Sequence, residues 1–151
     1  MPKKHMIYLG ADHAGFNLKE SVKAYLHKQK LACVDLGAHK YRTDDDYPEY
    51  AVLVAKKVAK SPAARGILLC GTGNGMAIAA NKVKGVRAAV AWDSYSAKKA
   101  AEDDAANILA LPARDITEQL AAAAVKAYLS HQPSEAARHK RRVKQIKKLE
   151  S

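Results

Sequence analysis

Short apolar segments and amphipathic segments alternate along the whole chain. The continuously apolar segments, which are typical of strands buried on both faces, cover residues 6–10, 31–36, 66–70, 86–91 and 107–111. Between them, apolar residues recur at helical spacing at Leu18, Val22, Tyr25 and Leu26, and again at Ala51, Val54, Ala55 and Val58. This alternation predicts an α/β fold in which a mostly parallel sheet is covered on both faces by helices.

The region after the last predicted strand is rich in alanine and is predicted to be helical. Asp115 is placed to cap this helix, with Glu118 at the spacing of a capping box. Pro133 then separates the helix from a basic C-terminal segment. No repeat or low-complexity linker interrupts the sequence. We therefore expect residues 1–151 to form a single domain, with 133–151 as a basic C-terminal helix or tail.

The tail carries more than half of the net charge. The 151 residues include 26 Lys and Arg against 15 Asp and Glu, a formal charge of +11, and residues 138–151 contribute +6 of it. A basic tail can bind nucleic acid, but this one has no interleaved aromatic residues. Val143, Ile146 and Leu149 recur at near-helical spacing, which predicts a helix that docks by one apolar edge. The charge therefore favours an anionic small substrate over nucleic acid.

The composition bears on where the protein is located and on whether it binds membranes or metals. No apolar run approaches the roughly 20 residues that span a bilayer, and no signal peptide is recognisable. The two cysteines, Cys33 and Cys70, do not make a disulfide framework, and no His/Cys cluster has the spacing of a zinc site. We expect a cytoplasmic protein with no membrane partner and no metal.

Asp12 and His13 directly follow the first predicted strand. Ligands of parallel α/β sheets bind beyond the carboxyl ends of the strands, so both side chains stand where a ligand is expected. The alternative is that Asp12 only caps the helix that follows and that His13 is an incidental loop residue.

Cys70 ends the third predicted strand and is followed by a glycine-rich loop, Gly71-Thr72-Gly73-Asn74-Gly75. The glycines allow backbone N–H groups to turn inward and bind a phosphate or an enediolate oxygen. A thiol at this junction is suited to act as a base or nucleophile. The alternative is a structural cysteine above a tight turn. A dinucleotide site is disfavoured, because the glycine spacing differs from that fingerprint and the loop follows the third strand.

Four basic residues are further cationic candidates. Arg114 follows the last predicted strand, and Arg138, His139 and Arg142 lie in the basic tail. Arg138 and Arg142 are four residues apart, which places them on one face of a helix where two guanidinium groups can bind one phosphate. The alternative is ordinary solvated surface charge.

Together these motifs resemble a known family. The matching segments occur in family order and are Gly10-Ala11-Asp12-His13-Ala14-Gly15-Phe16, Asp46-Tyr47-Pro48, Cys70-Gly71-Thr72-Gly73-Asn74-Gly75, Ile78-Ala79-Ala80-Asn81-Lys82, Tyr95-Ser96-Ala97, Arg138-His139 and Arg142-Val143. They resemble the type B ribose-5-phosphate isomerases, a group that includes galactose-6-phosphate isomerase subunits. The resemblance extends from residue 7 to residue 146.

The resemblance implies a fold, an assembly and a reaction. The fold would be a Rossmann-like three-layer αβα sandwich with an extended C-terminal interface helix. The assembly would be a homodimer, or a dimer of such dimers, with active sites at the interface. Ribose 5-phosphate and ribulose 5-phosphate would interconvert through an enediolate, as a step of the pentose phosphate pathway, with a sugar phosphate as the only small-molecule partner and no cofactor.

The resemblance also implies roles for single residues. Cys70 would move the proton between C1 and C2 with help from Thr72. The enediolate would be stabilised by the loop backbone at Gly71, Gly73, Asn74 and Gly75. Asp12 would bind the sugar hydroxyls, and the phosphate would be surrounded by His13, Arg114, Arg138 and Arg142.

One position departs from the family pattern. The family usually carries a His-Asn pair after the Tyr95-Ser96-Ala97 segment, where the His opens the furanose ring, but this chain has Asp103 and Asp104. Two carboxylates thus replace an imidazole and an amide, which puts the ring-opening step and the identity of the sugar in question. The alternatives are an isomerase of allose or galactose 6-phosphate or of a tetrose 4-phosphate, or a non-catalytic protein that binds sugar phosphate or nucleic acid.

Overall fold

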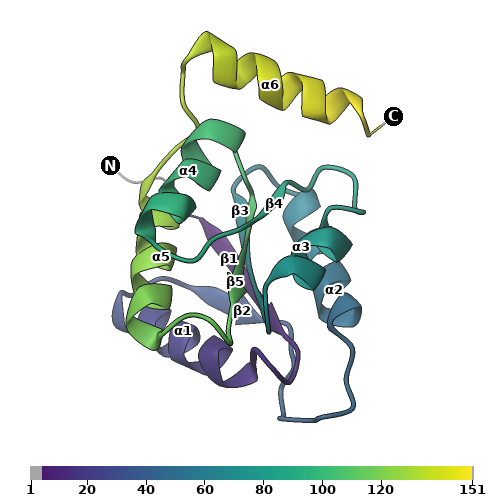
Figure 1. The fold of residues 1–151 in the computed structure, drawn as a ribbon, viewed down its shortest axis with the longest axis vertical. Helices are drawn as coiled ribbons and strands as arrows, with labels where there is room; N and C mark the ends of the chain where they lie inside the picture. The colour runs from purple at the N-terminus through teal and green to yellow at the C-terminus, as the bar shows by residue number, and fades with distance from the viewer. Residues whose placement is uncertain (1–4, 151) are drawn as a thin grey trace.

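The computed structural model describes residues 5–150 and confirms the predicted alternation of strands and helices (Figure 1). The strands are β1 (Met6–Ala11), β2 (Cys33–Asp35), β3 (Ala64–Cys70), β4 (Ala88–Val90) and β5 (Ile108–Pro112). The helices are α1 (Phe16–Lys28), α2 (Tyr47–Ala59), α3 (Asn74–Ala80), α4 (Ser94–Asp104), α5 (Glu118–Ser130) and α6 (Ala137–Lys148). The strands lie parallel in one sheet of order β2-β1-β3-β5-β4, which confirms the α/β prediction.

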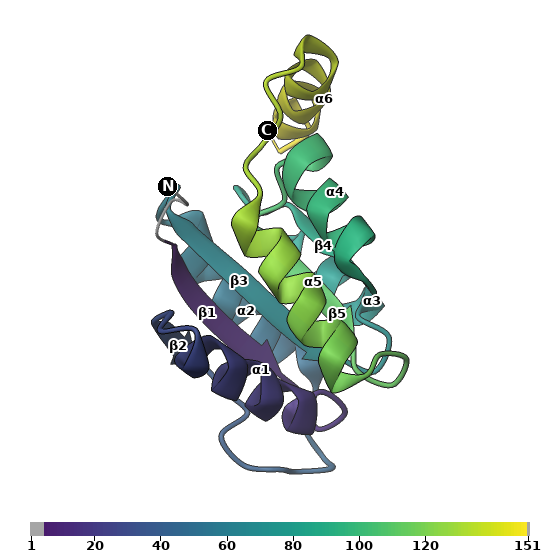
Figure 2. The same ribbon diagram turned by 90° about the vertical axis from the view of Figure 1, so that its left-hand side faces the viewer.

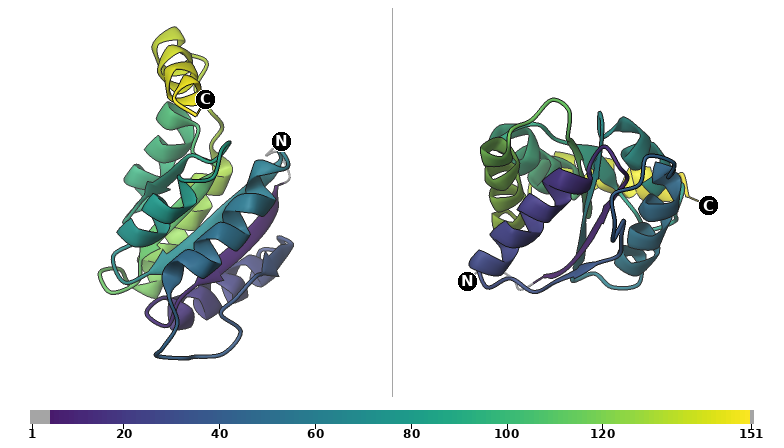
Figure 3. Two further views of the ribbon diagram at one scale, coloured as in Figure 1. Left: turned by 90° about the vertical axis from the view of Figure 1, so that its right-hand side faces the viewer. Right: turned by 90° about the horizontal axis from the view of Figure 1, so that it is seen from below.

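Helices cover both faces of the sheet and give the molecule three layers (Figures 2 and 3). On one face, Ile67 and Leu69 of β3 pack in a cluster with residues of α1, α4 and α5, such as Val125. On the other face, Leu68 packs with residues of α2 and α3, such as Val54. Successive side chains of a central strand thus enter different apolar clusters. This is why the strands are continuously apolar in sequence.

Helix α5 begins two residues later than the predicted Asp115 cap requires. Its cap is Thr117, whose Oγ1 accepts a hydrogen bond from the N–H of Leu120 at 3.1 Å. Asp115 belongs instead to the turn after β5, where its N–H donates to the carbonyl of Pro112 at 2.9 Å. The prediction of Asp115 as the cap is therefore wrong. Glu118 lies in the first helical turn, where its negative charge still favours the helix N-terminus.

Helix α6 follows the break at Pro133 but packs only lightly on its own chain. It is tied to α4 through the N–H of Ser134, which donates to the carbonyl of Glu102 at 2.8 Å. No residue of α6 is buried, and of the expected apolar edge only Val143 is half-buried, while Ile146 and Leu149 are 40% and 83% exposed. Within one chain, therefore, the apolar edge is only partly covered. Among residues 5–150, no helix has the length and apolarity needed to cross a membrane.

The topology defines two edges of the sheet that carry different residues. The chain reverses its direction of sheet growth between β1 and β3, which are neighbours, so ligands are expected at the carboxyl ends of these two strands. Helix α4 runs back toward the amino ends of the strands, and α6 lies beyond that same edge (Figures 1 and 2). The sheet thus has a carboxyl edge, where the strands end, and an amino edge, where they begin.

Candidate active site

Asp12 and Cys70 leave the sheet side by side at its carboxyl edge. Where β1 pairs with β3, the last partners are Ala11 and Leu69. Asp12 follows Ala11, and Cys70 follows Leu69. Both are almost completely buried, at 6% and 5% exposure. Asp12 Oδ1 accepts a hydrogen bond from the N–H of Gly15 at 3.1 Å, so this carboxylate also stabilises the turn that leads into α1. The structure thus brings together the first two predicted site residues.

The glycine loop between β3 and α3 allows two larger side chains to approach its backbone. A Cβ atom on Gly71 would lie 2.8 Å from Nη1 of Arg114, and one on Gly75 would lie 2.5 Å from the ring of Tyr47. Gly73 has a left-handed conformation with φ of 81°, which favours glycine. Arg114 is further fixed by its N–H, which donates to the carbonyl of Gly71 at 3.0 Å. The loop is therefore enclosed by Arg114 on one side and Tyr47 on another.

The hydroxyl of Thr72 organises the tip of the same loop. Its Oγ1 accepts a hydrogen bond from the N–H of Asn74 at 3.2 Å, and both residues are exposed. The N–H groups of the first turn of α3 have no acceptor within the helix, because none precedes them at the required spacing. The loop therefore presents a hydroxyl and several amides beside the thiol of Cys70. This arrangement suits a substrate on which negative charge develops.

His13 is held by a carboxylate that sequence reasoning missed. Asp45 accepts hydrogen bonds from the N–H of His13 at 3.0 Å and from the hydroxyl of Tyr50 at 3.1 Å, and it lies 2.7 Å from Nδ1 of His13. Burial raises the pKa of Asp45, but the hydrogen bonds from His13 and Tyr50 outweigh it and leave the pKa below its ordinary value. Asp45 is thus anionic at neutral pH and orients the imidazole of His13.

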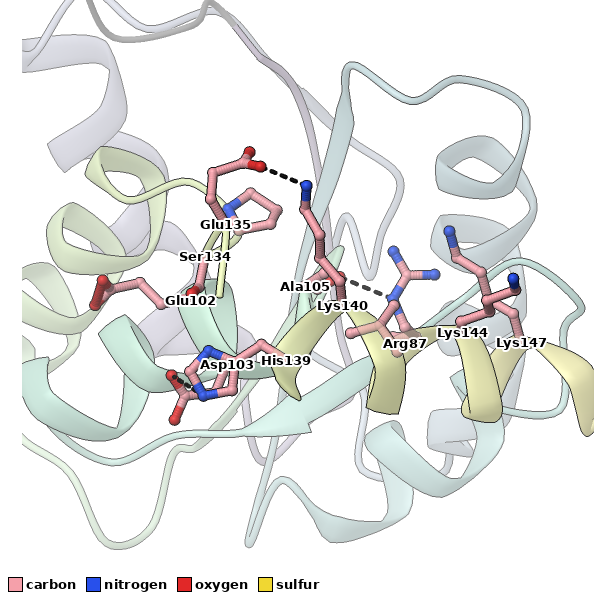
Figure 4. Close-up of a pocket in the computed structure, with 12 residues that line it drawn as sticks. Arg87, Glu102, Asp103, Ala105, Ser134, Glu135, His139, Lys140, Lys144 and Lys147 are labelled. Carbon is pink, nitrogen blue, oxygen red and sulfur yellow. Dashed lines mark hydrogen bonds and ion pairs between the residues drawn. The ribbon is translucent and has the colours of Figure 1, made fainter. Parts of the chain in front are cut away.

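A second group of predicted residues lies at the amino edge. Asp103 and Asp104 end α4, and Arg138 and Arg142 are exposed on α6. His139 lies beside Asp103, with Nε2 3.6 Å from Oδ1 (Figure 4). Between this group and Cys70 lies the length of β3, seven residues or roughly 20 Å. One chain therefore does not bring Asp103, Asp104, Arg138 and Arg142 to its own Cys70.

Neither the residues at the carboxyl edge nor those at the amino edge form a metal site among the described residues. Within residues 5–150, no three His, Cys, Asp or Glu side chains lie together in positions that could hold a metal ion. The carboxyl edge offers instead a thiol, a buried carboxylate, a fixed imidazole and a guanidinium around a glycine loop. This set is typical of a site that binds a phosphorylated polyol and transfers protons on it.

Comparison with known proteins defines the class. A model of the ribose/galactose isomerase family matches residues 7–146. The chain belongs to this family.

Individual relatives are more specific. A probable ribose-5-phosphate isomerase B from Mycoplasma pneumoniae is 42% identical over 146 residues, which cover 97% of this chain and 95% of the relative. The ribose-5-phosphate isomerase B of Mycobacterium tuberculosis H37Rv is 41% identical, with coverage of 91% and 85%. The crystal structure of ribose-5-phosphate isomerase B from Mycoplasma genitalium with bound ribulose-5-phosphate superposes with a TM-score of 0.92 and 40% identity, and covers 97% of this chain and 96% of that one.

Proposed function

We propose that this chain interconverts ribose 5-phosphate and ribulose 5-phosphate. The observation that carries the proposal is the thiol of Cys70 at the topological switch point, beside Asp12 and at the start of a glycine loop. The relatives named ribose-5-phosphate isomerase B, one of them solved with ribulose-5-phosphate, support this choice of sugar.

The reaction is a proton transfer between adjacent carbons. The Cys70 thiolate removes the proton from C2 of the open-chain aldose, and the electron pair moves through the C1–C2 bond onto the carbonyl oxygen O1. The resulting enediolate accepts hydrogen bonds from loop amides between Gly71 and Gly75. Cys70 then returns the proton to C1, while the hydroxyl of Thr72 moves a proton from O2 to O1. The sum is the ketose, with no atoms gained or lost.

Asp12 and two basic groups position the substrate. Asp12, fixed by its bond to the amide of Gly15, accepts hydrogen bonds from sugar hydroxyls. Arg114 and His13 supply positive or donor groups at the carboxyl edge. The phosphate provides binding energy remote from the reacting carbons, which holds C1 and C2 over the thiol.

The amino-edge group completes the site from a second copy of the chain. Arg138 and Arg142 are too far from Cys70 of their own chain to share its substrate, so we infer a dimer in which α6 of one subunit reaches the carboxyl edge of the other. The exposed apolar side chains of Ile146 in α6 and of Leu149, which follows it, support this arrangement. Large exposed side chains at Ile78, Trp92 and Tyr95 add further apolar surface for a partner.

Measurements of turnover and of binding test the proposal. Turnover of ribose 5-phosphate is compared with that of four-carbon and six-carbon sugar phosphates under the same conditions, and binding of each sugar phosphate is measured beside it. Preference for another sugar would overturn the choice of substrate, and saturable binding without turnover would overturn catalysis. The replacement of the family His-Asn pair by Asp103 and Asp104 makes a tetrose 4-phosphate the second candidate, since such a sugar cannot close a furanose ring.

The shared site is tested by subunit complementation. At substrate concentrations well below the wild-type KM, Cys70→Ala alone is expected to be inactive and Arg142→Ala alone to be only weakly active, because it binds the substrate poorly. After subunit exchange at equal concentrations, half of the dimers are mixed and each mixed dimer has one intact site. The mixture should therefore regain about a quarter of the wild-type activity. No recovery after verified exchange would show that each site is built from one chain.

A further inference from the structure

A largely buried imidazole at the junction of α4 and α6 makes no side-chain hydrogen bond among residues 5–150. The side chain of His139 is only 13% exposed, and its Nδ1 is buried without a partner in the part of the chain described. Its Nε2 lies 3.6 Å from Oδ1 of Asp103, close enough for an ion pair but too long for a hydrogen bond (Figure 4). Buried polar atoms are normally satisfied, so this histidine requires an explanation.

The surroundings of the pair are charged and open to ligands. Asp103 is 34% exposed, and its Oδ1 also lies 3.8 Å from Nζ of Lys99. The other charged groups near this junction are Glu102 and Lys98 from α4, Glu135 from the segment before α6, Lys140 from α6, and Arg87 from the segment before β4. All of these except Lys98 border a cavity of about 470 Å³, which Lys144 and Lys147 of α6 also line. A ligand that reaches this junction therefore meets the carboxylate of Asp103 beside Nε2 of His139.

The position of His139 in the chain links the pair to the substrate. It lies between Arg138 and Arg142, which the proposed dimer brings to the phosphate of a sugar bound at the partner's Cys70. His139 consequently arrives at the same substrate on the same helix, with Asp103 of α4 beside it. His13, the other imidazole of the proposed site, has Nδ1 already engaged by Asp45.

The chemistry of the substrate leaves a step for such a pair. Ribose 5-phosphate is mostly a furanose, whereas Cys70 acts on the open aldehyde. Opening requires that a base take the proton from the O1 hydroxyl. The O–H electron pair then forms the C1=O1 bond, the C1–O4 bond breaks, and O4 receives a proton. A carboxylate alone is a poor proton donor at neutral pH, whereas an imidazole gains and loses a proton readily there.

We propose that His139, positioned by Asp103, carries the proton for ring opening in the partner's active site. Nε2 takes the proton from O1, the adjacent carboxylate of Asp103 stabilises the imidazolium, and the same nitrogen returns the proton to O4. No co-reactant is needed, because the proton removed is the proton returned. This assignment rests on the proposed function, since it concerns a step before the proton transfer by Cys70.

The experiment measures how the rate of ribose 5-phosphate consumption depends on enzyme concentration. An enzyme that accepts only the open aldehyde is limited by spontaneous ring opening, so its rate stops rising as more enzyme is added. Wild type, which opens the ring itself, should stay proportional to enzyme concentration. His139→Gln and Asp103→Asn should reach a plateau, at least about tenfold below wild type at the highest enzyme concentration. Rapid-quench measurement of ribulose 5-phosphate conversion by the same variants should show an unchanged first turnover, because the ketose has no furanose ring to open.

A matched control and the contrary results complete the design. His27→Gln makes the same change at an exposed position of α1 and should behave as wild type. A His139→Gln rate that stays proportional to enzyme would overturn the proposal, as would equal losses with both sugars, which indicate a structural or binding role. A plateau in wild type would overturn it while leaving the proposed function intact. Failure of wild type to convert either sugar would remove the proposed function and this inference together.

Discussion

Lys19 is fully buried, and its replacement tests how the carboxyl edge of the sheet is held. Its Nζ donates hydrogen bonds to Oδ2 of Asp35 at 2.6 Å, to the carbonyl of Ala38 at 2.7 Å and to Glu20 at 3.2 Å. The N–H of Ala38 in turn donates to the carbonyl of Ala11, the last residue of β1. Lys19→Met keeps most of the volume but removes the charge and all three donors. The substitution therefore weakens the contacts that hold the end of β1, which Asp12 directly follows.

The cost of this change follows from the partners left behind. Breaking a buried ion pair costs about 3–5 kcal/mol, because the remaining charge is uncompensated. Asp35 keeps Lys23 at 3.0 Å and the N–H of Gly37 at 2.9 Å, which offset part of that cost. The carbonyl of Ala38 loses its donor, at about 1 kcal/mol. We expect a loss of about 3 kcal/mol, or roughly 6–12 °C in Tm for a chain of this size.

Urea titration and thermal unfolding measure the loss, with Lys23→Met as the matched control. Lys23 contacts the same carboxylate but is 32% exposed, so its removal should cost less than about 1 kcal/mol. Equal losses in the two variants, or a neutral Lys19→Met, would refute the reasoning from burial.

The ion pair between Lys19 and Asp35 predicts that the free energy of unfolding depends on pH. Burial raises the pKa of Asp35, but hydrogen bonds from Lys19, the Gly37 amide and Lys23 outweigh it and lower the pKa below its ordinary value. A lowered carboxyl pKa stabilises the fold above the unfolded value of about 4 and loses that contribution as the pH falls. The difference in unfolding free energy between wild type and Lys19→Met should therefore shrink below about pH 4. A difference that stays constant with pH would contradict the ion-pair explanation.

The remaining predictions concern the site itself. Cys70→Ser should abolish most turnover while substrate still binds, since a hydroxyl is too weak a base at neutral pH; a wild-type-like kcat would contradict the role of the thiol. Arg142→Ala should raise KM more than it lowers kcat, with a loss of about 1.5–3 kcal/mol for a charge-assisted contact, as steady-state kinetics will show. Gly15→Ala should prevent folding, because the new Cβ would lie 2.2 Å from the backbone oxygen of Leu69; soluble protein with a native circular dichroism spectrum would refute this.

Much of the fold is predictable because the parallel sheet is buried on both faces. Apolar runs predict all five strands to within two residues at each end, since every side chain of a central strand enters one of two apolar clusters. The cap of α5 is not predicted, because Asp115 and Thr117 both have side chains that cap helices and only the length of the turn after β5 selects between them.

The candidate site is predictable only where its residues follow a strand directly. Cys70 and Asp12 can be placed at the carboxyl edge from strand order alone. Asp45 cannot, because its contact with His13 joins residues 32 apart in sequence, and its hydrogen bond from Tyr50 depends on how the loop before α2 folds. The run of acidic residues before Tyr47-Pro48 is the one signal available, and it also suits an ordinary helix start.

Helix α6 is needed for the proposed catalysis but contributes little to the folding of a single chain. Since none of its residues is buried within one chain, substitutions at the exposed basic positions of Ala137–Lys148 escape the stability threshold that removes most core mutations. A screen for folded protein would accept variants that a kinetic screen rejects. A library that varies these basic positions and keeps Ile146, which the proposed dimer covers, would consequently explore substrate preference at little cost in soluble yield. This makes α6 a segment open to the evolution of a new sugar specificity.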